Sequence, residues 1–155
     1  MTRTIALLIG LVCVAGVLGQ DDSQSPAKRY GISLDAREFP QDTPKKTLES
    51  ALKAISDRRV DYLLAHLADP QFVDERVRKN HAGKFDEFVK ESASKLSNEP
   101  ESIKQLHRFL KEGEWEEGAA SASARLKDVK ERVFLRKVKD RWYLENRLNA
   151  EKTEE

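Results

Sequence analysis

Residues 132–146 read RVFLRKVKDRWYLEN and predict two β-strands joined by a tight turn. The run 132–138 is β-branched and aromatic, which favours a strand, and the run 142–146 suits a second strand that returns along it. Phe134 and Trp142 are the largest apolar groups here, and we expect them to join the sheet to the rest of the domain. Trp142 alternates with Tyr143, so only one of the two is expected to point at the core.

The chain just before this hairpin also has the periodicity of a strand. Small or apolar residues alternate there with polar ones, which predicts a half-buried strand whose polar face carries the two serines. The inward set is Ala120, Ala122, Ala124 and Leu126, and the outward set is Ser121, Ser123 and Arg125.

Further upstream the apolar period becomes helical. Thr43 can cap a helix whose first residue is Pro44, and its apolar stripe ends at Ile55. We expect Asp57 to cap a second helix that ends before Pro70.

A third helix is expected from Phe85 to Leu96, and Pro100 can open a fourth. Gly113 is placed to end that helix in a left-handed conformation. No element is assigned to residues 71–83. Helices first and strands last predict an α+β domain, with N-terminal helices packed on one face of a curved antiparallel sheet.

The N-terminus has the three parts of a signal peptide. Arg3 precedes an uncharged apolar stretch, and cleavage is expected between Gly19 and Gln20, so that residues 1–19 are removed. The alternative of a lipid on Cys13 has less support, because Cys13 lies in the middle of the apolar stretch. The sequence therefore predicts a secreted or periplasmic protein with no membrane span after cleavage.

The remaining chain divides into a polar flexible tether over 20–42, a single α+β domain over 43–148 and a disordered tail over 149–155. Apolar residues in the tether leave open that it packs as a short edge segment. They are Tyr30, Ile32, Leu34 and Phe39.

The composition restricts the function. The 155 residues carry 28 Lys and Arg against 27 Asp and Glu, so the strong basic excess of a nucleic-acid-binding protein is absent. Cys13 is the only cysteine, so the cleaved chain has no disulfide and no thiolate for catalysis or metal binding.

The order of elements resembles the cystatin-like α+β roll of the nuclear transport factor 2-like superfamily. The resemblance covers about residues 42–148 and depends on Thr43-Pro44, the helical run 51–64 and the closing run 138–144. It implies a cone of helices and curved sheet whose open end binds small ligands or performs chemistry. Two features depart from the family: Arg141 follows Asp140 where Asp-Gly is common, and two helices occupy residues 84–112.

Candidates for catalysis are few. His66, His81 and His107 fall on separate segments without metal-ligand spacing, and each is expected at the surface or its boundary. Superfamily enzymes use Asp, His or Tyr in the cone, and the residues of the right type are Asp61, Tyr62 and Tyr143. None of them can be given a catalytic role from the motif.

Two charged groups occur in the second half of the chain. The acidic group, Glu112, Glu114, Glu116 and Glu117, lacks a calcium-loop pattern and suggests a solvated rim. The basic group predicts at most a mildly basic face for an anionic partner. Its members are Arg125, Arg132, Arg136, Lys137, Lys139 and Arg141.

These observations lead to one hypothesis and two alternatives. We expect an exported, non-enzymatic domain that binds a small ligand or an envelope protein, without a cofactor or a metal. A small enzyme that uses the cone as its pocket is one alternative. A structural or assembly module, which a homodimer would favour, is the other.

Overall fold

A computed structural model describes residues 27–147. The predicted signal peptide, its cleavage site at Gly19 and Gln20, and the tail over 149–155 lie outside these residues. The described elements, in chain order, are β1 (Lys28–Arg29), β2 (Ile32–Ser33), α1 (Pro44–Ser56), α2 (Val60–Tyr62), a π-helical turn η1 (Leu63–Leu67), α3 (Pro70–Asn80), α4 (Phe85–Asn98), α5 (Pro100–Glu112), β3 (Glu114–Glu117), β4 (Ser121–Arg125), β5 (Arg132–Val138) and β6 (Arg141–Leu144). The predicted α+β class, with helices before an antiparallel sheet, is confirmed.

The sheet is an antiparallel meander in the order β3-β4-β5-β6. Val138 pairs with Arg141, so the predicted closing hairpin turns through two residues, Lys139 and Asp140. Lys139 has φ 55°, a left-handed conformation that glycine adopts more easily than lysine. Strand β3 was not predicted, because charged residues occupy most of it.

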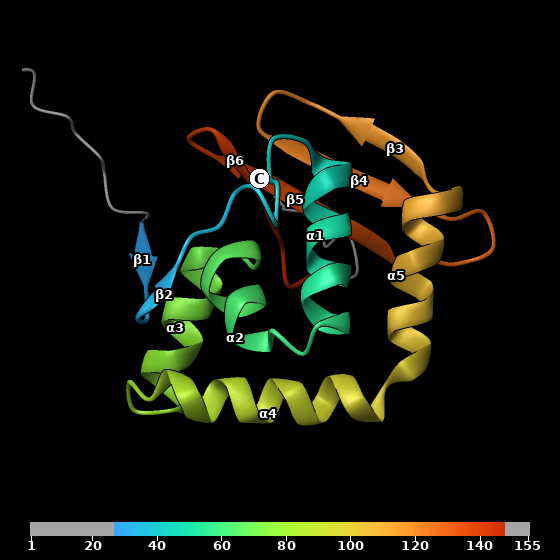
Figure 1. The fold of residues 1–155 in the computed structure, drawn as a ribbon. Coiled ribbons are helices and arrows are strands. Elements are labelled where there is room, and N and C mark those ends of the chain that lie inside the picture. The colour runs from blue at the N-terminus through green and yellow to red at the C-terminus, as the bar shows by residue number, and fades with distance from the viewer. Residues whose placement is uncertain (1–26, 148–155) are drawn as a thin grey trace, which may run out of the picture.

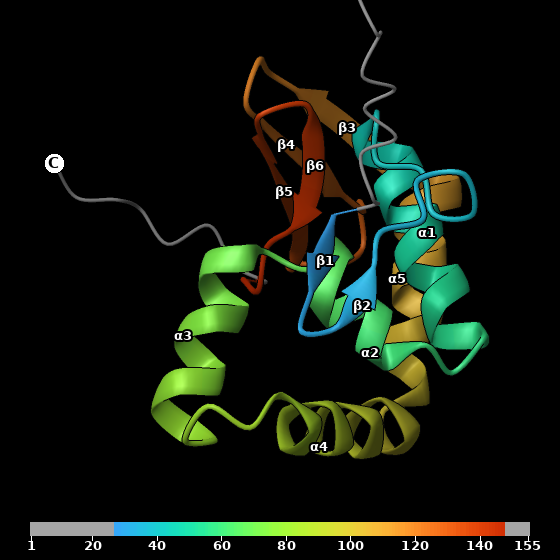
Figure 2. The ribbon, with the colours of Figure 1, turned by 60° about the vertical axis from the view of Figure 1, so that its left-hand side comes forward.

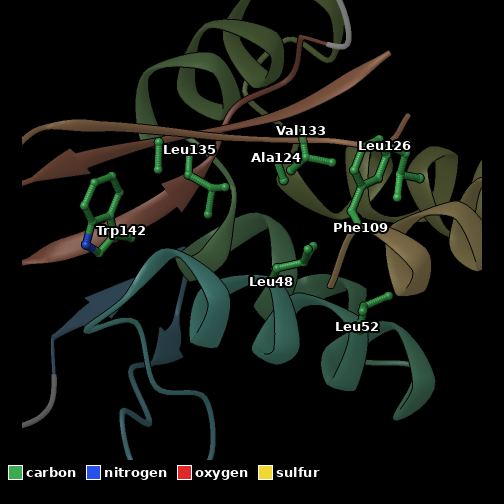
Figure 3. Close-up of a cluster of buried hydrophobic side chains, with 9 residues drawn as sticks. Leu48, Leu52, Phe109, Ala124, Leu126, Val133, Leu135 and Trp142 are labelled. Atoms are coloured by element: carbon green, nitrogen blue, oxygen red, sulfur yellow. The ribbon is translucent and has the colours of Figure 1, made fainter. Parts of the chain in front are cut away.

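The main core lies between one face of the sheet and helices α1 and α5, which stand side by side against it (Figures 1 and 2). Leu48 and Leu52 of α1 and Phe109 of α5 meet Trp142 and inward residues of the middle strands (Figure 3). The buried members from the sheet are Ala122, Ala124, Leu126, Val133, Leu135 and Trp142. Side chains therefore fill the space between these helices and the sheet.

The opposite face of the sheet is also partly covered. Phe134 pairs with Ser123 on that face, and the Arg147 guanidinium lies 4.2 Å from the centre of its ring. The prediction that Phe134 joins the sheet to the helices is therefore wrong, whereas Trp142 does so. Of Trp142 and Tyr143, only Trp142 belongs to the main core, as expected from their alternation, although Tyr143 is also buried, on the opposite face.

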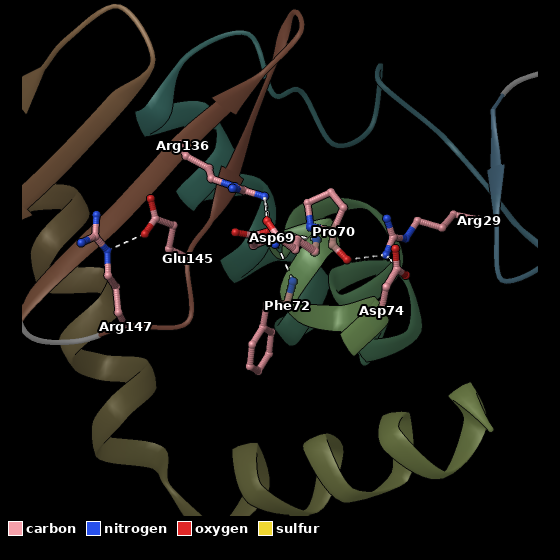
Figure 4. A network of polar contacts seen from close by, with 9 residues as sticks. Arg29, Asp69, Pro70, Phe72, Asp74, Arg136, Glu145 and Arg147 are labelled. Atoms are coloured by element: carbon pink, nitrogen blue, oxygen red, sulfur yellow. Dashed lines mark hydrogen bonds and ion pairs between the residues drawn. The ribbon is translucent and has the colours of Figure 1, made fainter. Parts of the chain in front are cut away.

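The start of α3 covers part of this second face. Asp69 caps α3 through the backbone N–H of Gln71, and its carboxylate accepts a hydrogen bond from Arg136 of β5 at 2.7 Å (Figure 4). Asp69 and Pro70 therefore start α3, whereas the sequence predicted only that the preceding helix ends there. Residues 71–83, to which the sequence assigned no element, contain most of α3 and the turn that follows it.

Two helix ends differ from expectation. Asp57 is the C-terminal cap of α1 and does not cap a second helix, which begins only at Val60 and continues as the π-helical turn. Gly113 has φ −65° and ψ 139°, so it continues into β3 in an extended conformation and is not left-handed. Thr43, in contrast, caps α1 as predicted, by accepting from the N–H of Lys46.

The prediction of a flexible tether is wrong for residues 27–42. Strands β1 and β2 form a small hairpin, and Phe39 is completely buried. Arg29 donates to the carbonyl oxygen of Pro70 at 2.9 Å and pairs with Asp74 (Figure 4), while the Tyr30 ring stacks on Phe85 at 4.1 Å. The alternative of a short packed segment is the correct one, because its apolar residues cover α2, η1 and α3.

Candidate binding site

His66 is a buried structural residue and not the boundary residue expected. It is 2% exposed, and its Nε2–H donates to the carbonyl oxygen of Ile32 at 2.9 Å. Its ring lies 4.9 Å from that of Tyr62. Burial lowers the pKa of His66, and the positive charges of Arg141 and Arg29 act in the same direction. The neutral imidazole therefore ties the N-terminal hairpin to η1.

The other two histidines lie elsewhere. His81 follows α3, with Nε2 3.0 Å from a carboxylate oxygen of Glu91 and its ring against Phe88. His107 is exposed on α5. The three histidines thus belong to three different elements.

The aspartate and tyrosine candidates have structural partners. Asp61 pairs with Arg59 at 3.2 Å on the surface. The Tyr62 hydroxyl donates to the carbonyl oxygen of Asp35 and accepts from its N–H, and burial raises the pKa of this phenol. Tyr143 lies on the sheet face away from α1. These side chains do not form a convergent catalytic group.

Several members of the two charged groups form ion pairs. Glu114 contacts Arg125 at 2.9 Å and Lys127 at 3.6 Å, and Glu112 contacts Arg108. Among residues 27–147, no three His, Cys, Asp or Glu side chains are arranged to hold a metal ion. Ser121 is exposed and Ser123 half-buried on the polar face of β4, as predicted.

Helix α4 passes across the ends of α1 and α5 (Figures 1 and 2), and residues of these helices line an apolar cleft. Its volume is about 370 Å³. It is lined by Ile55, Ser56, Arg58, Val60, Val89, Ala93, Leu96, Ser97 and Ile103. The exposed members are Ser56, Arg58 and Ser97, so they form the rim, while the apolar members are buried or half-buried.

Helix geometry explains how the cleft forms. Val89, Ala93 and Leu96 recur at helical spacing on one side of α4, and Ile103 faces them from α5. The sequence predicted a helix from Phe85 to Leu96 and another from Pro100, but no cleft that exposes Val89, Leu96 and Ile103 between them. They remain half-exposed because α4 packs on the body mainly through Phe85 and Phe88 in its first turns.

Arg58 on the rim occupies a conformation that is unusual for arginine. The Arg59 N–H donates to the carbonyl oxygen of Ala54 at 2.7 Å, and the Arg58 N–H donates to that of Ile55 at 3.1 Å. This pair of bonds is the Schellman motif, in which the residue after the C-cap is left-handed and is usually glycine. Arg58 has φ 58° in that position. The sequence signal for this residue was the absence of glycine after Asp57, where α1 must end.

Three other hollows have more charged or polar residues in their lining. One of about 440 Å³ lies at the turn between β4 and β5 and is lined by Arg125, Lys127, Lys130 and Arg132 together with Glu114. Another of about 470 Å³ lies beside Tyr62, where Asp35, Glu38, Arg59 and Asp61 join the apolar residues. The third, about 340 Å³, lies on the outer sheet face near Phe134 and Arg147. The cleft at α4 is the most apolar of the four, and apolar lining is typical of small-molecule sites.

No family model, curated protein or solved structure matched the chain. Within residues 27–147, none of the helices has the length and apolar character needed to cross a membrane. The function of the domain is therefore inferred from the geometry of the molecule itself.

Proposed function

We propose that this domain is a non-enzymatic ligand-binding module of an exported protein, and that it binds its ligand in the apolar cleft between α1, α4 and α5. The observation that carries the proposal is the cleft itself. Its volume of about 370 Å³ falls in the range of small-molecule sites, which is about 300–1,000 Å³. The signal-peptide pattern that contains Arg3 supports a location outside the cytoplasm, secreted or periplasmic.

The half-exposed apolar side chains of the cleft favour binding of an apolar ligand. Val89, Leu96 and Ile103 leave part of their surface in water, and removing apolar surface from water releases about 25 cal/mol per Å². A ligand that covers these side chains gains this free energy without any rearrangement of the main core. The contacts of Tyr62 support binding over catalysis, because its hydroxyl already holds the backbone of Asp35.

We further propose that the domain is a cone-like roll of the nuclear transport factor 2-like superfamily. The order of elements supports this, with Thr43-Pro44 opening α1 and a four-stranded antiparallel meander closing the chain. In this proposal, core side chains such as Leu48 and Trp142 fill the space between helices and sheet, and the ligand site lies outside it, beside α4.

A neutral apolar dye, N-phenyl-1-naphthylamine, tests the proposed site. We expect saturable dye fluorescence with the exported chain, and a loss of at least about tenfold in affinity for Ala93→Phe, which fills the cleft. Ser94→Phe is the matched control, because Ser94 is the exposed next residue of α4 and does not line the cleft. Equal dye affinity in the wild type and in folded Ala93→Phe would refute the proposed site.

A further inference from the structure

We infer that the ligand of this cleft is an amphiphile with an apolar chain and an anionic head group, and that Arg58 pairs with the head group. This inference rests on the proposed binding function and names the ligand class. Its basis is the chemistry of the rim, where Arg58 is the only charged residue among those that line the cleft.

The charge of Arg58 is available for a ligand. The carboxylates nearest in sequence already have cationic partners, since Asp57 pairs with Lys53 at 2.5 Å and Asp61 pairs with Arg59. Among the described residues, no carboxylate oxygen lies within 4.0 Å of a side-chain nitrogen of Arg58. An anion at the rim therefore meets a cation that has no competing ion pair.

The backbone conformation at position 58 makes arginine there unfavourable for stability. A left-handed conformation is unfavourable for a residue with a Cβ atom, and glycine would satisfy the same Schellman bonds without that strain. Positive charge at the end of α1 does not require Arg58, because Lys53 and Arg59 lie there too. Sites that break a local structural rule are often functional sites.

Two serines on the rim, Ser56 and Ser97, also affect which polar groups of a ligand can be bound there. Ser97 donates its hydroxyl hydrogen to the carbonyl oxygen of Ala93 at 2.9 Å, so towards a ligand it retains only acceptor capacity. Ser56 also lies on the rim, and its hydroxyl can donate to a head group next to Arg58. Arginine presents several N–H donors in a fork that matches a carboxylate or a phosphate.

Three probes with the same ten-carbon chain test the inference: decanoate, decanol and decylamine. Each is titrated against the dye-loaded exported chain at low ionic strength. We expect decanoate to displace the dye at about fivefold lower concentration than decanol, the magnitude of an exposed ion pair, and decylamine to be the weakest. Added salt should reduce the preference for decanoate.

The variants separate charge from backbone strain. Arg58→Gln keeps a side chain in the left-handed position and should abolish the preference for decanoate while decanol still displaces the dye. Arg58→Lys should retain most of the preference. If the wild type does not prefer decanoate, or if Arg58→Gln keeps the preference, the anionic head group is wrong and the apolar site stands. If no probe displaces the dye and Ala93→Phe does not weaken it, the proposed function fails as well.

Discussion

Replacing Trp142 with alanine should destabilise the domain by about 4 kcal/mol. Trp142 is 3% exposed and belongs to the core cluster together with the completely buried Leu48 and Leu135. Truncating a buried aromatic residue costs about 3–5 kcal/mol, because the transfer free energy is lost and a cavity remains. The cavity cannot collapse easily here, because two hydrogen bonds fix the backbone of Trp142. Its N–H donates to the carbonyl oxygen of Gln41 at 3.0 Å, and the side-chain amide of Gln41 donates to the carbonyl oxygen of Trp142 at 2.8 Å.

The second tryptophan is a matched control. Trp115 lies on the other edge strand, β3, where it is half-buried, and its buried indole N–H has no hydrogen-bond partner among residues 27–147. Trp115→Ala should therefore cost less than about 2 kcal/mol, because removing an unpaired buried donor offsets part of the lost packing. Urea unfolding followed by far-UV circular dichroism measures both changes. A loss below about 1 kcal/mol for Trp142→Ala, or equal losses for the two variants, would refute this account of the core.

Further predictions concern pH, backbone strain and export. Because the folded-state pKa of His66 is lowered from its usual 6.5, the unfolded chain takes up this proton first, and the stability from neutral His66 should fall as the pH drops below about 6.5. Urea melts between about pH 7 and pH 5 should show this loss in the wild type and in exposed His107→Gln but not in His66→Gln. Lys139→Gly and Arg58→Gly should each raise the free energy of unfolding by about 0.5–1 kcal/mol, because glycine relieves a left-handed conformation at some entropic cost; a lower melting temperature for both would contradict this. Intact-mass measurement of the exported protein should give a chain that begins at Gln20, and a mass that retains Met1 or includes a lipid on Cys13 would exclude the cleavage site.

Periodicity predicted the elements whose local signals agree with their packing. Thr43 and Pro44 predict the start of α1. The alternation at 120–126 predicts β4, and the run 132–138 predicts β5. In β4, for example, the buried residues Ala122 and Ala124 both face the main core. Local pattern and tertiary environment therefore lead to the same structure.

The failures occur where contacts from distant segments decide the structure. Residues 27–42 look like a tether because their apolar residues are sparse, yet Phe39 is buried through contact with Tyr62. Strand β3 is nearly all charged, and it pairs only because β4 presents a free edge to it.

The candidate site was less predictable still. A cleft depends on how α4 crosses α1 and α5, and no spacing within one helix encodes that crossing. The strained Arg58 could have been noticed from the lack of glycine, but its place on the rim could not.

The position of the sheet at the end of the chain affects how the protein matures. During synthesis α1 emerges early, and its Ala51 and Ala54 can pack at once against η1 nearby in sequence. Its other face, with Leu48 and Leu52, has no sheet to cover it until β6 is made. The core therefore cannot close until β6 has been made. Under the export proposed above, the chain would cross the membrane before this core closes, with Leu48 and Leu52 uncovered by the sheet.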